Sequence, residues 1–286
     1  MRKKTELSEI DVSLIRALAL DLDGTTLLPD TSMGEKTRQC LKNLIARGIQ
    51  IIICTGRAIE SSRPYYSAIG AQGPMVFFNG AEVAQVPENK LIKSDLLSLD
   101  VIDFGIDLSR RMNIHFQVFF PPQNGSWENL VVERESPESE TYRKHTGIAP
   151  LVTDLKAAIA KPDIRGVMKA MFIAAPDVLA QIRPMLTEQF GDRIYITGSH
   201  PQFLEIMNAG VNKGEGLKTV MRYSGLKPEQ VIAFGDEEND LPMFDAAGFS
   251  AAPCSAKEKI REAADFIYGS VAEEGLAAFL NELFGL

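Results

Sequence analysis

The chain has 286 residues, of which 30 are Lys or Arg and 38 are Asp or Glu, so its formal net charge at pH 7 is −8. A composition that is 45% hydrophobic and 24% charged is typical of a globular protein and excludes a disordered, collagenous or coiled-coil chain. The acidic balance argues against a general nucleic-acid binder, because neutralising phosphates requires a basic face. The length favours two domains.

The sequence also indicates a compartment. Acidic residues, Glu6, Glu9 and Asp11, occupy the segment where a signal peptide would need an apolar stretch. No apolar run approaches the roughly 18 residues of a membrane span. The 3 cysteines are widely spaced and form no CxxC pair, which fits a reducing compartment better than a disulfide framework or a zinc site. We therefore expect a soluble cytoplasmic protein that contacts neither nucleic acid nor membrane.

The two ends of the chain alternate short apolar runs with amphipathic segments. In chain order we predict a strand at 15–20, a helix at 37–47, strands at 49–54 and 75–78, then a helix at 214–225, a strand at 230–234 and a helix from 241 to 247. The strands are almost continuously apolar and end in polar turns. This order predicts a doubly wound α/β fold, with its site at the carboxyl ends of a parallel sheet.

The middle of the chain follows a different pattern. We predict a hairpin at 82–95, a helix at 98–112, strands at 114–120, 129–134 and 167–174, a helix at 176–190 and a strand at 193–197. Hairpins suit an antiparallel sheet, so this part is predicted to be a separate α+β domain of normal size. We assign residues 1–81 and 201–286 to the core and residues 82–200 to the inserted domain.

Two acidic clusters follow predicted strands. Asp21 and Asp23 come directly after the first strand, and period-two alternation would point both carboxylates to one side. Two close carboxylates repel each other unless a proton or a cation lies between them. Taken alone, this sequence is equally consistent with an Asp-Gly turn that carries one capping Asp.

The second cluster, GDEEND at 235–240, follows the strand at 230–234. Two strand ends of a parallel sheet would bring both clusters into one acidic pocket. Mg²⁺ prefers oxygen ligands and keeps several waters, so carboxylates and a substrate phosphate would suit it. Asp236 and Asp240 are four residues apart and would share one helix face, although acids are also favoured at a helix N-terminus by the dipole.

Two further turns favour phosphate. The turn Thr55-Gly56-Arg57 lies between a strand and a helix, where a hydroxyl and free backbone N–H groups could hold phosphate oxygens. Lys213 lies just before a helix, where its charge could neutralise a transferring phosphoryl group. A capping Thr and a surface Lys are the ordinary interpretations of each feature alone. Their joint occurrence with the acidic clusters predicts a phosphate site.

Taken in this order, DLDGT at 21–25, TGR at 55–57, Lys213 and GDEEND at 235–240 resemble the haloacid dehalogenase (HAD) superfamily of phosphatases. More narrowly, NGA at 79–81 and FLEI at 203–206 resemble the Cof-type hydrolases, which carry a large cap inserted after the third core strand. The resemblance covers essentially the whole chain in motif order and layout. It implies a HAD-like Rossmannoid α/β core with a parallel sheet, plus an inserted α+β cap that sets substrate specificity.

The resemblance also implies roles for particular residues. Asp21 would be the nucleophile that forms an aspartyl-phosphate, and Asp23 would protonate the leaving alcohol and later activate water. Mg²⁺ would be held by Asp21, the Asp23 carbonyl and Asp236, with Glu237 close by. The phosphoryl group would be bound by the Leu22 backbone, Thr55, the Gly56 amide, Lys213 and Asn239. Supporting positions would be Asp240, which would orient Lys213 or the metal waters, and also Arg57 and Asn79.

The sequence departs from the family pattern in two places. Ser255 stands where the family typically has Asn, and residues 207–210 lack a common proline. Both changes could alter the rim of the pocket. Trp127 is a weak candidate for stacking on substrate, since a large aromatic residue in a loop more often anchors that loop.

We therefore expect a Mg²⁺-dependent phosphatase that acts on small phosphorylated metabolites such as sugar phosphates. One alternative is a phosphomutase or phosphotransferase that uses the same Asp pair. Another is a metabolite-binding regulator without activity. The sequence argues against this alternative, because every acid and base that the mechanism needs is present. The sequence identifies no particular substrate, because specificity in such folds lies in residues outside the motifs.

Overall fold

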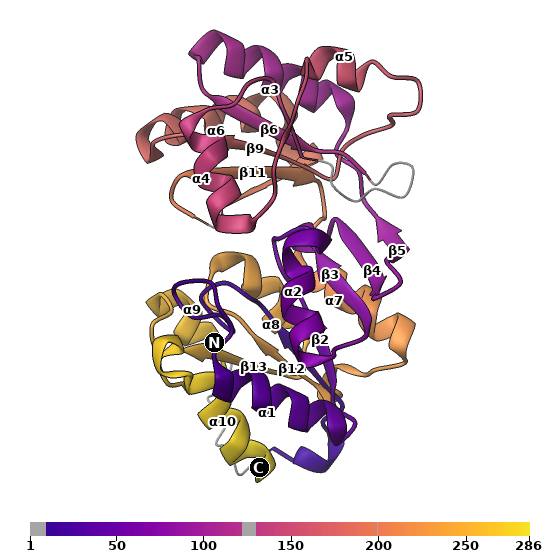
Figure 1. Ribbon diagram of the computed structural model, residues 1–286, viewed down its shortest axis with the longest axis vertical. Helices are drawn as coiled ribbons and strands as arrows, with labels where there is room; N and C mark the ends of the chain where they lie inside the picture. The colour runs from indigo at the N-terminus through magenta and orange to yellow at the C-terminus, as the bar shows by residue number, and fades with distance from the viewer. Residues whose placement is uncertain (1–9, 122–129, 199) are drawn as a thin grey trace. The chain divides into compact units, whose positions relative to one another are not determined.

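The computed structural model describes residues 10–121, 130–198 and 200–286 (Figure 1). These residues form two compact units. The first contains the described residues of Met1–Gly56, Ser62–Lys93 and Asn212–Leu286, and the second contains those of Arg57–Ser61 and Ser94–Val211. The chain therefore leaves the first unit, builds most of the second and returns.

The first unit is built on a five-stranded sheet. Its strands in spatial order are β14 (Phe266–Tyr268), β13 (Phe249–Pro253), β12 (Val231–Phe234), β1 (Ala17–Leu20) and β2 (Gln50–Ile53). Every neighbouring pair is parallel. The predicted parallel α/β sheet is thus confirmed, and β1 lies inside it with a partner on each edge. The carboxyl ends of β1, β2 and β12 consequently meet at one edge of the sheet.

Helices of the first unit pack against one another in pairs (Figure 1): α1 (Glu35–Ala46) against α10 (Gly275–Phe284), and α7 (Lys213–Ser224) against α8 (Leu241–Ala246). Its remaining helices are α2 (Ile59–Ile69), which begins in the second unit, and α9 (Glu258–Ala263). Ala17 and Ala19 belong to the apolar cluster that includes Leu217 of α7. All four residues of β1 are buried. Burial on both faces explains why this strand reads as an unbroken apolar run.

A small antiparallel sheet extends the first unit. Its strands are β3 (Gly73–Phe77), β4 (Glu82–Val86) and β5 (Lys90–Ser94), and a single parallel bridge joins Cys54 after β2 to Val76 of β3. The hairpin predicted at 82–95 is present. Our sequence assignment placed it in the inserted domain, whereas residues up to Lys93 belong to the first unit, because β4 pairs with β3 along its whole length.

The second unit is built on a six-stranded sheet. In spatial order its strands are β10 (Ile194–Thr197), β11 (Phe203–Asn208), β9 (Lys169–Ile173), β6 (His115–Phe119), β7 (Leu130–Val132) and β8 (Leu151–Val152). All pairs are antiparallel except β7 with β8. Residues 201–211, which we assigned to the core, lie in the second unit because β11 pairs with β9 and β10.

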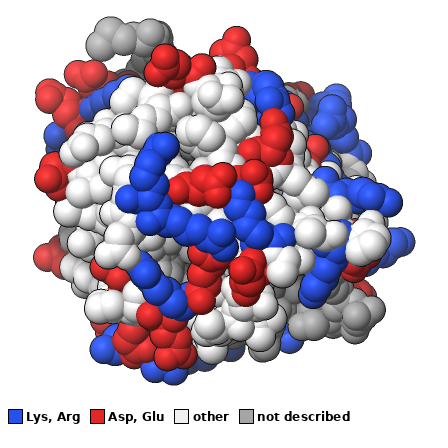
Figure 2. Space-filling model, turned by 90° about the horizontal axis from the view of Figure 1, so that it is seen from above, with Lys and Arg blue, Asp and Glu red and all other residues white. Residues whose placement is uncertain are grey.

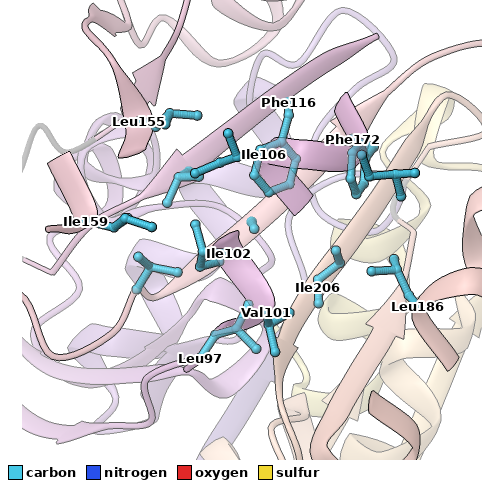
Figure 3. Close-up of a cluster of buried hydrophobic side chains, with 14 of the residues drawn as sticks. Leu97, Val101, Ile102, Ile106, Phe116, Leu155, Ile159, Phe172, Leu186 and Ile206 are labelled. Atoms are coloured by element: carbon cyan, nitrogen blue, oxygen red, sulfur yellow. The ribbon is translucent and has the colours of Figure 1, made fainter. Parts of the chain in front are cut away.

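The second unit has an apolar core of its own (Figure 3). Its helices are α3 (Leu99–Met112), α4 (Pro137–Thr146), α5 (Leu155–Ile159) and α6 (Pro176–Phe190). In Figure 3 Ile102 and Ile106 of α3 lie near Phe116 of β6, and Leu186 of α6 belongs to the same cluster. The helices predicted at 98–112 and 176–190 are confirmed within one residue.

Several surface charges of the second unit form ion pairs with opposite charges. Lys156 Nζ lies 2.5 Å from Asp103 Oδ1 and 2.9 Å from Asp107 Oδ1, and Arg110 lies 2.5 Å from Glu133. Figure 2 shows basic and acidic side chains interleaved on the face it displays, with no large area of one sign. Exposed pairs of this kind contribute little to stability. Among the described residues, no helix combines the length and the apolar character needed to cross a membrane.

A residue near the end of the chain caps the first long helix. α1 begins after Gly34, which has no side chain to act as a cap, and the Thr37 amide instead donates to Glu274 Oε2 at 2.8 Å. A Cβ on Gly34 would lie 2.2 Å from that same carboxylate oxygen. The charge of Glu274 is favourable at this end of the helix dipole. The contact fixes α1 to the segment just before α10.

Candidate active site

Asp21 directly continues β1 at the carboxyl edge of the parallel sheet. Its amide donates to the Phe234 carbonyl at the end of β12, 3.0 Å away, so the ladder between these strands extends to Asp21. The Asp21 side chain is buried. The chain then turns, and the Leu22 carbonyl accepts a hydrogen bond from the Thr26 amide at 2.9 Å. Asp23 lies in this turn and is only partly buried.

Lys213 is the first residue of α7, whose start is capped by the Asn212 side chain. Its ammonium lies 2.7 Å from Asp21 Oδ1 and 2.6 Å from Asp240 Oδ1. The side chain is 1% exposed, so it is not a solvated surface lysine. Removing a charge from water is costly unless it is paired. The two carboxylates supply that pairing, and the lysine therefore links the turn after β1 to the acidic loop.

Asp240 is fully buried and uses both of its oxygens. Its Oδ1 accepts from Lys213, and its Oδ2 accepts from the backbone amides of Asp236 at 2.9 Å and Glu237 at 3.0 Å. A Cβ on Gly235 would lie 2.4 Å from Asp240 Cβ. Asp240 thus folds the acidic loop around itself and points one oxygen at Lys213. Of the two roles that the sequence left open for Asp240, the geometry favours the orientation of Lys213.

The turn after β1 lies directly against Asp236. The Thr25 hydroxyl donates to Asp236 Oδ1 at 2.7 Å. Gly24 has a φ of +75°, and a Cβ there would lie only 2.2 Å from Asp236 Oδ2. Both the backbone conformation and the close approach therefore require glycine at this position.

The site concentrates negative charge in a buried place. Oxygens of Asp21, Asp236 and Asp240 all lie within 4.8 Å of one another. Burial raises the pKa of Asp21 well above its usual range, although Lys213 opposes this. Burial, with Asp240 nearby, raises the pKa of Asp236 to about 7. Burial also opposes the charge on Lys213, but Asp21 and Asp240 outweigh it and raise the Lys213 pKa.

These residues fit a hard divalent cation. Three carboxylates and one ammonium leave an excess of two negative charges when all are ionised. Both oxygens of Asp240 already accept hydrogen bonds, so Asp21 and Asp236 are the carboxylates left to act as ligands. Oxygen donors and an excess of negative charge are what Mg²⁺ selects.

A polar bridge connects the turn after β2 with the acidic loop. The backbone amide of Asn79 donates to the Thr55 carbonyl at 2.9 Å. The side chain of Asn79 accepts at Oδ1 from Asn239 Nδ2 at 3.0 Å. A Cβ on Gly56 would lie 3.1 Å from Asn79 Oδ1. The side-chain oxygen of Asn239, Oδ1, is buried and has no hydrogen-bond partner among the described residues. A buried polar group left in this way indicates a place for a polar ligand.

Three further residues selected from the sequence are not members of the carboxylate cluster or cannot be placed. The Glu237 carboxylate accepts from Lys257 Nζ at 2.8 Å and is not one of the three clustered acids. Arg57 belongs to the second unit, whereas Thr55 and Gly56 belong to the first. Trp127 lies outside the described residues.

Sequence reasoning missed two residues that contact this site. Thr25 belongs to the DLDGT motif, but nothing in its spacing indicated that its hydroxyl would hold Asp236. Tyr268, the last residue of β14, donates from its hydroxyl to the Thr25 carbonyl at 3.1 Å. An apolar strand with an aromatic residue at its end carries no local signal for this contact.

A model of the family described as haloacid dehalogenase-like hydrolase matches residues 18–280, which is nearly the whole chain. The chain belongs to this family. The predicted HAD-like fold, with its core and its cap, is therefore confirmed, and the chain is an enzyme, a phosphoric monoester hydrolase.

Named HAD relatives match along most of their length. The 5-amino-6-(5-phospho-D-ribitylamino)uracil phosphatase YitU of Bacillus subtilis is 29% identical over 277 residues, which is 94% of this chain and 97% of the relative. An HMP-PP phosphatase of an Enterobacter species is 30% identical over 235 residues, 82% of each chain. The crystal structure of TM0651 from Thermotoga maritima matches with a TM-score of 0.80 at 28% identity, covering 94% of this chain and 97% of the other.

Substituting Gly24 should damage both stability and activity. Gly24→Ala places a methyl group against the Asp236 carboxylate, whereas Gly48→Ala, at a similar φ of +86°, meets nothing within 4 Å. Both variants bear the cost of about 1 to 2 kcal/mol for a left-handed alanine. Only Gly24→Ala should also lose phosphatase activity, by about 100-fold, since a small misplacement of a site residue has effects of that size. Urea unfolding and hydrolysis of p-nitrophenyl phosphate measure the two effects, and equal activity losses would contradict the contact.

Without a divalent cation, stability should fall as pH rises from about 4 to about 7. The pKa of Asp236 is raised from 3.8 to about 7. In this window the folded chain holds a proton that the unfolded chain has released, so raising the pH favours unfolding. Thermal unfolding in EDTA across this range should therefore show a steeper loss in the wild type than in Asp236→Asn. The exposed Asp245→Asn variant should keep the wild-type slope; a wild-type slope in Asp236→Asn would count against the raised pKa.

Proposed function

We propose that this enzyme is a Mg²⁺-dependent phosphatase of small phosphorylated metabolites that works through an aspartyl-phosphate on Asp21. The observation that carries the proposal is the buried group at the carboxyl edge of the sheet, in which Lys213 contacts Asp21 at 2.7 Å and Asp240 at 2.6 Å while Asp236 lies beside them. Phosphoryl transfer to a side chain requires a nucleophile, a fixed positive charge such as that of Lys213, and further carboxylates that can bind a metal ion.

Asp21 and Asp236, with the Asp23 carbonyl, are the groups that would hold Mg²⁺. When bound, the cation would neutralise negative charge on the carboxylates and on the phosphoryl oxygens. This neutralisation matters because burial raises the pKa of Asp21. A carboxylate that retained its proton could not attack phosphorus. The positive charge of Lys213 acts in the same direction as the cation.

In the first step, an Asp21 oxygen attacks phosphorus and the bond from phosphorus to the substrate oxygen breaks. Asp23 donates its proton to that oxygen, so the product leaves as a neutral alcohol. The partly buried position of Asp23, two residues beyond Asp21, suits a group that must meet both substrate and water. Asp21 now carries the phosphoryl group as a mixed anhydride.

In the second step, the Asp23 carboxylate accepts a proton from water while the water oxygen attacks phosphorus. The bond between phosphorus and Asp21 breaks, which releases phosphate and returns Asp21 to its carboxylate form. Asp23 is then protonated again and ready for the next substrate. One carboxyl group can serve as acid and then as base because the first step leaves it deprotonated.

The phosphoryl oxygens need donors during both steps. We assign this role to Lys213, to the Thr55 hydroxyl and to the amides of Leu22 and Gly56, with Asn239 as a further contact. Support comes from the chain order, which places Thr55 and Gly56 after β2, beside β1, and from the Asn79 bridge that ties this turn to Asn239. Fixed donors of this kind stabilise charge as it develops in the transition state.

The second unit is proposed to select the substrate. The two relatives named above are phosphatases of different phosphorylated compounds, although both resemble this chain along most of their length. A shared core with different substrates indicates that selection lies outside the core machinery. We therefore propose a small phosphate monoester as substrate. A screen of such compounds with Mg²⁺, ranked by kcat/KM, would identify it, and release of free phosphate would separate a phosphatase from a phosphotransferase.

Replacing the nucleophile should abolish turnover without unfolding the chain. Asp21→Asn removes one of three clustered negative charges and leaves Lys213 paired with Asp240. We expect hydrolysis of p-nitrophenyl phosphate in Mg²⁺ to fall about 10⁴-fold or more. The control is Asp30→Asn, which changes an exposed carboxylate hydrogen-bonded to Ser32 in the same segment. Wild-type activity in Asp21→Asn would rule out the aspartyl-phosphate.

Replacing Asp23 should separate the two steps. p-Nitrophenolate leaves without needing a proton, so Asp23→Asn should still be phosphorylated by p-nitrophenyl phosphate, whereas hydrolysis of the intermediate should slow by about 10²- to 10⁴-fold. Rapid mixing should therefore show a burst of p-nitrophenol close to the enzyme concentration. Mass spectrometry should locate the phosphoryl group on Asp21. A slow linear rate with no burst and no modified enzyme would contradict the second role of Asp23.

A further inference from the structure

Tyr268 ends β14 and is enclosed by aromatic rings. Its ring centroid lies 6.1 Å from that of Phe234, at the end of β12, and 6.1 Å from that of Phe279 in α10. The residue is 3% exposed. Burial raises the Tyr268 pKa well above its usual range, so the hydroxyl stays protonated and acts as a donor. The rings fix the direction in which this hydroxyl points.

The Tyr268 hydroxyl donates to the Thr25 carbonyl at 3.1 Å. Thr25 is itself fully buried, and its own hydroxyl donates to Asp236 Oδ1 at 2.7 Å. The backbone carbonyl of Thr25 is therefore fixed by Tyr268 at the end of β14. The side chain of Thr25 in turn fixes the Asp236 carboxylate. The chain of contacts runs from Tyr268 through Thr25 to Asp236.

We propose that Tyr268 is a positioning residue that sets the affinity of the acidic cluster for its divalent cation, by fixing Thr25 against Asp236. The proposal rests on the proposed function, which makes Asp236 a ligand of Mg²⁺. A carboxylate held in one orientation before the cation arrives loses less freedom on binding, so the cation binds more tightly. Tyr268 touches neither substrate nor cation, so its effect should lie in cation affinity rather than in the chemical step.

A purely structural role for the hydroxyl would make a different prediction, and the chain offers a matched control. Tyr65 also donates from its hydroxyl to a backbone carbonyl, that of Thr31, at 3.0 Å. Tyr65→Phe therefore removes a bond of the same chemical type that does not lead to Asp236. Both substitutions should lower the stability of the cation-free protein, and Tyr268→Phe should lower it more because its hydrogen bond is buried and that of Tyr65 is only partly buried. Only Tyr268→Phe should change the response to Mg²⁺.

The experiment titrates Mg²⁺ into the full chain and records two quantities. The first is the rise of Tm with Mg²⁺ in the absence of substrate, and the second is the Mg²⁺ concentration that gives half-maximal hydrolysis of p-nitrophenyl phosphate. For Tyr268→Phe we expect both to report an affinity about three- to tenfold weaker than that of the wild type, as the loss of one hydrogen bond predicts. At saturating Mg²⁺, kcat should stay within about twofold of the wild type. Tyr65→Phe should keep the wild-type affinity.

Thr25→Val tests the second half of the path, because it removes the hydroxyl that contacts Asp236 and keeps the size of the side chain. It should weaken Mg²⁺ binding at least as much as Tyr268→Phe, and adding Tyr268→Phe to it should change little further, since both act through one contact. Additive losses would overturn the proposal. So would an unchanged Mg²⁺ affinity in Tyr268→Phe, a loss confined to kcat, an equal loss in Tyr65→Phe, or a Tyr268→Phe chain that does not fold.

Failure of this inference can be told apart from failure of the proposed function. A wild-type protein whose Tm and activity do not respond to Mg²⁺ would overturn the proposed cation dependence itself, and the inference with it. If the wild type responds to Mg²⁺, the comparison of Tyr268→Phe with Tyr65→Phe tests the role of Tyr268 alone. Neither result of that comparison would contradict the proposed function.

Discussion

Three carboxylates that lie within 4.8 Å of one another in a buried place repel one another strongly, and the structure of the first unit is organised around holding them there. Lys213 offsets part of the repulsion between Asp21 and Asp240, and two backbone amides bind the other oxygen of Asp240. When all of these groups are ionised, two negative charges remain in excess. The proposed binding of a phosphate ester at this site would therefore call for further positive charge, which is the role proposed for Mg²⁺.

Precise placement of these groups comes from several separate parts of the chain. Asp21 is fixed by the strand pair β1 and β12, Lys213 by the start of α7, and Asp236 by the turn that contains Gly24 and Thr25. Each part contributes one or two contacts of ordinary strength. Together these contacts fix the positions of the charged side chains, because they come from rigid elements and meet at one site. A protein preorganises charged groups in this way.

Much of this arrangement could be predicted from the sequence. The strands were recognisable because burial on both faces makes them continuously apolar, and the acidic clusters stood out because each interrupts such a run. The order of the motifs then predicted that Asp21, Lys213 and Asp236 belong to one site. The limits of the two units were not predictable in the same way, since the pairing partner of a strand such as β4 or β11 leaves no mark in its own sequence.

Contacts between residues far apart in the chain were the other class that the sequence did not reveal. By sequence alone, Tyr268 is an ordinary aromatic residue at the end of an apolar strand, and Glu274 is an ordinary acidic residue. In the structure Tyr268 contacts the turn after β1, and Glu274 caps α1. Helix propensity and strand alternation describe neighbours in sequence. They carry no information about a hydroxyl or a carboxylate whose partner lies more than 200 residues away.

The position of β1 between β2 and β12 has a consequence for how the protein is made. A chain emerging from the ribosome has β1 and β2 early, but one edge of β1 stays unpaired until β12 has been synthesised. The second unit has its own apolar core and is complete by Val211. During synthesis it can therefore fold while one edge of β1 is still unpaired, so Asp21 is fixed against Phe234 of β12 only after the second unit is complete.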